Sequence, residues 1–253
     1  MNSKSFIIFD VFAEFGHFRK FNTTTSPLSY SIPTPTAIAG LIGAVLGIER
    51  EDNKNKVKQG NTPLRWVFSP KNTKIGIRVL NKVNKVNIGF NLLDTDSPQS
   101  FFNIISRTQI EYELLKNPVY RIYLDWKHPR RSELIDRLTN KQFHFNPYLG
   151  LSQFTADMTW VGEKQGKKIE SHNYVPIHSA INLSQLSDKE TPVDFELMKK
   201  QQIQVETLPI EMKSNRVITR YGEVLVETTG NPILSKVSNE AYAIEGEGNI
   251  QLL

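Results

Sequence analysis

A cluster of side chains suited to binding a nucleic-acid backbone lies near the N-terminus of the chain. Its candidate contacts are His17, Arg19, Lys20, Thr23, Thr24 and Ser26. Basic groups neutralise phosphates, hydroxyl groups hydrogen-bond to phosphate or 2′-OH groups, and Phe18 or Tyr30 can stack on a base. The same composition also suits a surface loop whose threonines cap turns and whose phenylalanines fill the core. The cluster therefore predicts an RNA contact, with the ordinary surface loop as an open alternative.

Basic and aromatic residues also alternate over residues 107–126. This segment, RTQIEYELLKNPVYRIYLDW, is typical of two strands joined by a turn at Asn117 and Pro118. Such alternation on a hairpin can make an RNA platform or a protruding thumb, so further candidate RNA contacts are Arg107, Gln109 and Arg121. An amphipathic hairpin with one solvated charged face is the more common outcome of this pattern.

Few residue patterns in the chain point to metal binding or catalysis. Cysteine is absent and the histidines lack metal-ligand spacing, so we expect no metal and no cofactor. Adjacent Lys127 and His128 have the side chains that an RNA-cleaving site needs, for moving the 2′-OH proton and stabilising the phosphorane charge. Neighbours on a strand point to opposite faces, so only a bulge or the bend before Pro129 would bring them together. The sequence accordingly favours a protein without a catalytic site.

Composition indicates a globular chain with a mild basic excess. The 253 residues are 39% hydrophobic and 23% charged, which is enough apolar material for a sizeable core. The net charge of +5 is compatible with a polyanionic partner. No apolar run reaches the roughly 18–20 residues needed to span a bilayer, and we expect a cytoplasmic protein without membrane contact.

The order of predicted elements indicates an α+β fold. A strand over 6–12 is apolar on both faces, and Thr34 and Pro35 begin a helix whose small residues permit close packing on a sheet. Further expected elements are strands at 74–80 and 86–93, a helix at 130–140, a hairpin over 157–178 with its tip at 164–168, and a hairpin turn at 229–231. The β–α–β–β–α–β order favours a ferredoxin-like or RRM-like domain over residues 1–150 and a β-rich part over 151–253.

Several segments together resemble the Cas-five family of CRISPR-associated proteins, in the variety found with type I-B systems. They are FIIFDVF, HFRKFNTTTSPLSYSIPTPTAIAGLIGAVLGIE, RTQIEYELLKNPVYRIYL, PYLGLSQF and YGEVLVETTGNPI. The resemblance implies a protein of the repeat-associated (RAMP) superfamily with a ferredoxin-like, RRM-related N-terminal domain.

The resemblance also implies a place in an RNA-guided complex for antiviral defence. Members of the family lie at one end of the Cascade effector complex and hold the 5′ handle of the CRISPR RNA. The implied partners are CRISPR RNA, the Cascade backbone and large subunits and, through the complex, target DNA. The handle-binding positions would be His17, Arg19, Lys20, Thr23, Thr24 and Ser26, and the hairpin over 107–126 would be the thumb that enters between guide bases.

One branch of the family has a different activity. Type I-C members cut the precursor RNA without metal, using a Tyr, a Lys and a His, and the matching residue types in this chain are Tyr30, Lys127 and His128. A metal-independent endoribonuclease is therefore the alternative function. Because the resemblance is to the I-B branch, where a separate nuclease does the cutting, we expect a non-catalytic binding subunit. A structural adaptor that contacts mainly protein is a third possibility.

Overall fold

The chain folds mostly into β-strands. The computed structural model describes residues 3–20, 26–49, 64–93, 102, 107–187, 190–213 and 217–253. Within these residues the strands form one six-stranded sheet and two three-stranded sheets, and the pairing is almost entirely antiparallel. No helix in this part of the chain is both long enough and apolar enough to cross a membrane.

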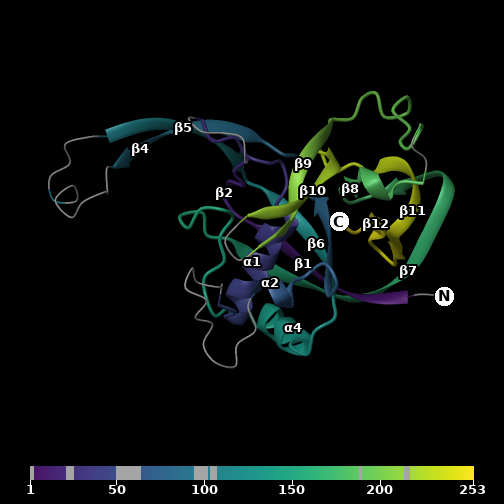
Figure 1. The fold of residues 1–253 in the computed structure, drawn as a ribbon, viewed down its shortest axis with the longest axis horizontal. Helices are drawn as coiled ribbons and strands as arrows, with labels where there is room; N and C mark the ends of the chain where they lie inside the picture. Colours follow the sequence, from purple (N-terminus) through teal and green to yellow (C-terminus); the bar gives the residue numbers. More distant parts are fainter. Residues whose placement is uncertain are drawn as a thin grey trace.

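The six-stranded sheet forms the centre of the molecule (Figure 1). Its strand order is β11 (Ile233–Ile244), β12 (Gly248–Gln251), β7 (Asp157–Ile177), β1 (Ser3–Phe12), β6 (Val119–Trp126) and β3 (Thr73–Val79). β1 is hydrogen-bonded to β6 on one side and to β7 on the other. The predicted central strand at 6–12 is thus confirmed.

Both faces of β1 are buried, which explains its apolar sequence. Ile7 and Phe9 belong to the large core that contains residues of α1 (Pro35–Leu46) and α4 (Arg131–Thr139). Phe6 and Ile8 belong to a second core on the opposite face, which the curled end of the sheet at β11 and β12 covers. A strand with apolar residues on both faces needs cover on both sides, and the fold provides it.

Helix α1 begins where its sequence predicts. The Thr34 hydroxyl accepts a hydrogen bond from the Ala37 amide at 3.1 Å, and Gly47 ends the helix with a φ of 66°. The small residues do not all serve close packing, however. A side chain at Gly43 would lie 2.5 Å from Leu64 of α2 (Leu64–Val67), whereas one at Gly40 would meet nothing within 4 Å. The Gly40 side of the helix therefore lies beside open space rather than against a sheet.

A separate sheet carries a long hairpin that extends away from the body of the molecule (Figure 1). It contains β2 (Phe15–Gly16), β5 (Arg107–Lys116) and β4 (Lys85–Leu93), with β4 and β5 paired from Lys85 opposite Leu115 to Leu93 opposite Arg107. The two strands predicted within 107–126 are present, but the expected hairpin between them is wrong. β6 already pairs with β1 and β3 along its two edges, so β5 pairs with β4 instead.

The expected hairpin over 157–178 is also wrong. β7 is one continuous strand of 21 residues that pairs with β1 and then with β11. Two glycines within β7 have roles in the packing of a continuous strand. Gly162 lies at an irregularity in the pairing with β1, and Gly166 packs so closely on Phe6 that a side chain there would lie 2.5 Å from the ring.

The third sheet contains β8 (Ile181–Asn182), β10 (Ile218–Glu227) and β9 (Ile203–Met212), and a short 3-10 helix, Leu183–Gln185, follows β8. The turn at 229–231 is present, with a φ of 89° at Gly230. It does not make a hairpin, because β10 and β11 on either side of it belong to different sheets. The division of the chain into two parts at residue 150 stays a prediction. β7, the first strand after this position, is hydrogen-bonded to β1 of the first part.

Candidate nucleic-acid interface

The N-terminal loop is held by its own backbone pairing. Lys20 N donates to Leu28 O at 2.8 Å and Tyr30 N donates to Phe18 O at 2.8 Å. Thr23 and Thr24 lie outside the described residues, and Ser26 is exposed. Phe18 and Tyr30 are both buried in the wall of a cavity, so the stacking of either one on a base stays a prediction. The Tyr30 hydroxyl instead donates to Thr207 O of β9 at 2.9 Å.

Lys20 joins this loop to β9 through a buried carboxylate. Its Nζ lies 3.3 Å from Glu206 Oε1 and 5.6 Å from the centre of the Tyr30 ring. Glu206 also accepts hydrogen bonds from the amide and hydroxyl of Ser31, at 2.9 and 3.1 Å. A buried carboxylate needs a cation and hydrogen bonds to stay charged, so Lys20 has a structural partner. Arg19 is exposed at the edge of a large cavity.

His17 is buried in one defined tautomer. Its Nδ1 lies 2.9 Å from Glu113 O of β5, and because a carbonyl only accepts, Nδ1 carries the proton. Burial lowers the pKa of His17, and the nearby charge of Arg19 lowers it further. The imidazole is therefore neutral at neutral pH, with its bare nitrogen at Nε2.

An aromatic chain connects His17 to the projecting hairpin. The His17 ring packs edge-on against Tyr112 of β5 at 5.2 Å, and Tyr112 packs edge-on against Phe90 of β4 at 5.0 Å. On the other face of the hairpin, Arg107 and Gln109 are exposed near its distal end. The hairpin thus presents an aromatic face that continues toward the loop and a polar face that carries two of the predicted contacts.

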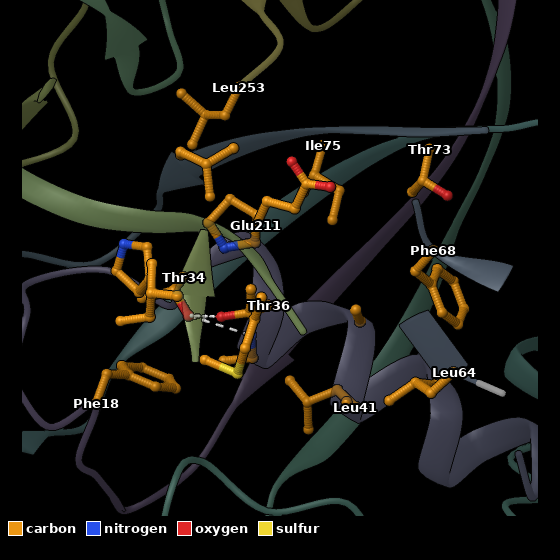
Figure 2. Close-up of a pocket in the computed structure, with 18 of the residues that line it drawn as sticks. Phe18, Thr34, Thr36, Leu41, Leu64, Phe68, Thr73, Ile75, Glu211 and Leu253 are labelled. Atoms are coloured by element: carbon orange, nitrogen blue, oxygen red, sulfur yellow. Dashed lines mark hydrogen bonds between the residues drawn. The ribbon is translucent and has the colours of Figure 1, made fainter. Parts of the chain in front are cut away.

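A cavity of about 1480 Å³ lies between α1 and the β9–β10 pair (Figure 2). The open Gly40 side of α1 forms part of its wall, and Leu41, Leu64 and Phe68 are grouped at this side. Its charged lining residues are Arg19, Lys71, Lys74, Lys213 and Arg220 against Glu211. This excess of positive charge attracts a polyanion.

Arg121 lies in the central sheet, apart from the other predicted contacts. Its guanidinium donates to Asp10 of β1 at 2.7 and 2.9 Å and to Glu247 at 2.9 Å. Glu247 is buried and also accepts from Lys164 at 2.8 Å and Tyr123 at 3.0 Å. The bonds that Arg121 makes to Asp10 and, to a smaller extent, to Glu247 raise the pKa of its guanidinium. The structure places Arg121 in an internal ion network, which the sequence analysis did not predict.

The three residues of the alternative catalytic site do not come together. The His128 ring stacks on Trp126 at 4.9 Å, and its Nδ1 accepts from the Arg130 amide at 3.2 Å. Tyr30 lies near the other end of β6, where Tyr120 donates to Ser31 O. Eight residues of extended chain from Tyr120 to His128 span roughly 25 Å. In the part of the chain that the structure describes, no three His, Asp or Glu residues form a metal-binding group.

Two residues that sequence reasoning did not assign to the site lie next to His17. Gly150 has a φ of 86°, and a side chain there would lie 1.7 Å from His17 O, so only glycine fits. Tyr148, in the same turn, is 46% exposed and lines the cavity together with His17. The packing of this turn against His17 is a contact between distant parts of the chain, which only the fold shows.

The family model described as CRISPR-associated protein (Cas_Cas5) matches residues 6–227. A chain of a CRISPR RNA-guided surveillance complex is similar in fold, with a TM-score of 0.53 at 12% identity, over 91% of this chain and 91% of that chain. A CRISPR protein from Archaeoglobus fulgidus has a TM-score of 0.50 at 13% identity, over 98% and 97% of the two chains. No curated protein matches the chain.

Proposed function

The chain belongs to the Cas-five family of CRISPR-associated proteins, and we propose that it is the subunit of a type I-B Cascade complex that holds the 5′ handle of the CRISPR RNA. In this role it binds RNA without cutting it and contacts the backbone and large subunits of the complex. The similarity in fold to a chain of an RNA-guided surveillance complex supports RNA as the ligand.

The arrangement of the central sheet supports the ferredoxin-like interpretation of the RAMP core. Four of its strands have the order β7-β1-β6-β3, α1 follows β1, and α4 follows β6. This is the β–α–β–β–α–β sequence of elements expected for such a unit. The RNA would then bind beside this core, where the N-terminal loop, the hairpin and β9–β10 meet.

The observation that carries the proposal is the cation-rich cavity beside the aromatic chain. Arg19 and Arg220 lie at the cavity, and Tyr112 and Phe90 continue from its edge along the hairpin. Proteins that hold single-stranded RNA combine a positive groove for the backbone with aromatic side chains for the bases. The exposed Arg107 at the distal end of the β4–β5 hairpin makes this hairpin the candidate thumb, in place of the hairpin expected over 107–126.

Binding of labelled repeat-derived RNA across a range of salt concentrations tests this function. We expect Arg19→Ala and Arg107→Ala each to weaken binding roughly tenfold, because each removes one charged contact with phosphate. Each should also reduce the slope of log K against log salt by about 0.7, the value for one phosphate of a single strand.

Two control variants each remove one positive charge outside the proposed RNA contacts. Lys116 is exposed at the opposite end of β5 from Arg107, and Lys141 is exposed just beyond α4. Lys116→Ala and Lys141→Ala should leave affinity and salt slope close to those of the wild type. Equal affinity of the wild type for handle and random RNA would reject the handle-binding function and favour the protein adaptor.

A further inference from the structure

His17 keeps a buried nitrogen without a hydrogen-bond partner. Its side chain is buried, and its Nε2 has no partner among the described residues. Leaving a buried acceptor unpaired costs stability, so such a group in a folded protein calls for an explanation. A ligand that supplies the missing hydrogen bond is one such explanation.

The tautomer decides which ligand groups this nitrogen can bind. Nδ1 donates to Glu113 O, so Nε2 carries a lone pair and accepts hydrogen bonds. A lone pair repels a phosphate oxygen, which is itself an acceptor. His17 therefore cannot hold the RNA backbone as a cation would, and its ligand must be a donor.

The surroundings of His17 suit a nucleotide. His17 lines the cation-rich cavity, with Arg19 two residues further along the chain and the Tyr112 ring against its own. Nε2 is covered in this structure, so a neighbouring group has to move before a ligand can reach it. Tyr148 also lines the cavity and is 46% exposed, and exposed side chains rotate readily.

We propose that His17 Nε2 accepts a hydrogen bond from one nucleotide of the bound RNA, donated by a ribose 2′-hydroxyl or by a base N–H. This inference rests on the proposed function and adds a specificity contact to it. Phosphate contacts position RNA without distinguishing it from other nucleic acids, whereas a contact to a 2′-hydroxyl or a base does distinguish it.

The test combines two protein variants with a scan of the handle RNA. Single nucleotides are replaced in turn by their 2′-deoxy form or by an abasic form, and each RNA is bound to the wild type, His17→Phe and His17→Gln. Phe removes the acceptor at similar ring size, and Gln offers an amide N–H toward Glu113 and an oxygen as acceptor. Urea unfolding of each variant shows whether the fold is kept.

We expect the wild type to lose roughly tenfold in affinity at one position of the scan. His17→Phe should bind unmodified RNA about tenfold more weakly and should show no further loss at that position, because the two changes remove the same bond. His17→Gln should recover part of the affinity. A loss with the 2′-deoxy form identifies the ribose as the donor, and a loss with only the abasic form identifies the base.

Two results would overturn the inference. One is a His17→Phe protein that is folded and binds handle RNA as tightly as the wild type. The other is a scan in which no single replacement weakens binding to the wild type, and this result stands even if His17→Phe fails to fold. A wild-type protein that does not prefer handle RNA at all would instead reject the proposed function.

Discussion

Two of the basic residues predicted to bind RNA, Lys20 and Arg121, are held in the fold by carboxylates that are buried or half-buried. Glu206 engages Lys20, and Asp10 and Glu247 engage Arg121. A buried charge without a partner is costly, so these basic residues are held where the carboxylates lie. Arg19 and Arg107 are exposed, and they are the basic residues that we assign to RNA.

Replacing Arg121 tests this assignment at the scale of a single residue. Arg121→Leu leaves the carboxylates of Asp10 and Glu247 without their guanidinium, and the Glu247 side chain is only 3% exposed. We expect the free energy of unfolding in urea to fall by about 3 kcal/mol, while RNA affinity of the folded protein is unchanged. Arg107→Leu, on the exposed hairpin, should change stability by less than about 0.5 kcal/mol. Equal stabilities of the two variants would contradict the structural role of Arg121.

Among the elements, helix α1 packs against α2 with one side and lines the cavity with another. A different small residue makes each of these possible. Gly43 lets Leu64 of α2 pack against the helix, and Gly40 leaves room for the cavity. The cap at Thr34 and the left-handed Gly47 fix the two ends of the helix between them. The position of the helix therefore sets one wall of the candidate RNA site.

Alanine substitution at each of the two glycines tests these different surroundings through the stability of the protein. Gly40→Ala should stabilise the protein by about 0.5–1 kcal/mol, because alanine favours the helix and its methyl group meets open space. At Gly43 the same methyl group would lie 2.5 Å from a Leu64 methyl carbon, so Leu64 has to move and the gain should be smaller or negative. Urea unfolding of both variants measures the difference. A larger gain from Gly43→Ala would mean that Gly43 does not pack as described.

At the scale of the whole molecule, the central sheet separates the residues that an RNA-cleaving site would need. Tyr30 lies near the start of β6, and Lys127 and His128 follow its end. The His128 ring belongs to a stack with Trp126 and Phe68. This separation supports the proposal that the protein binds RNA without cutting it.

Incubation of the purified protein with labelled repeat RNA in EDTA tests that proposal. We expect a shifted complex on a native gel and intact RNA on a denaturing gel, with the same result for His128→Ala. A single cut within the repeat that His128→Ala abolishes would instead identify a metal-independent endoribonuclease, and its 2′,3′-cyclic phosphate end would show attack by the 2′-OH.

Local patterns in the sequence were enough to predict the elements whose cause lies within a few neighbouring residues. β1, α1 with its Thr34 cap, the two strands within 107–126 and helix α4 all lie where the pattern predicts them. Capping joins residues three positions apart, and strand and helix periods repeat within a few residues. The same local composition identified the N-terminal loop and the exposed residues Arg19 and Arg107 as candidates for RNA binding.

The way in which distant segments combine became visible only in the folded chain. β5 pairs with β4 because both edges of β6 are occupied, and β7 runs unbroken because β1 and β11 provide its partners. The partners of Lys20 and Arg121 lie far away in the chain, as does the Glu113 carbonyl that fixes the tautomer of His17. No local pattern specifies contacts at such separations, since they depend on which sheet edges and buried charges meet after the chain has folded.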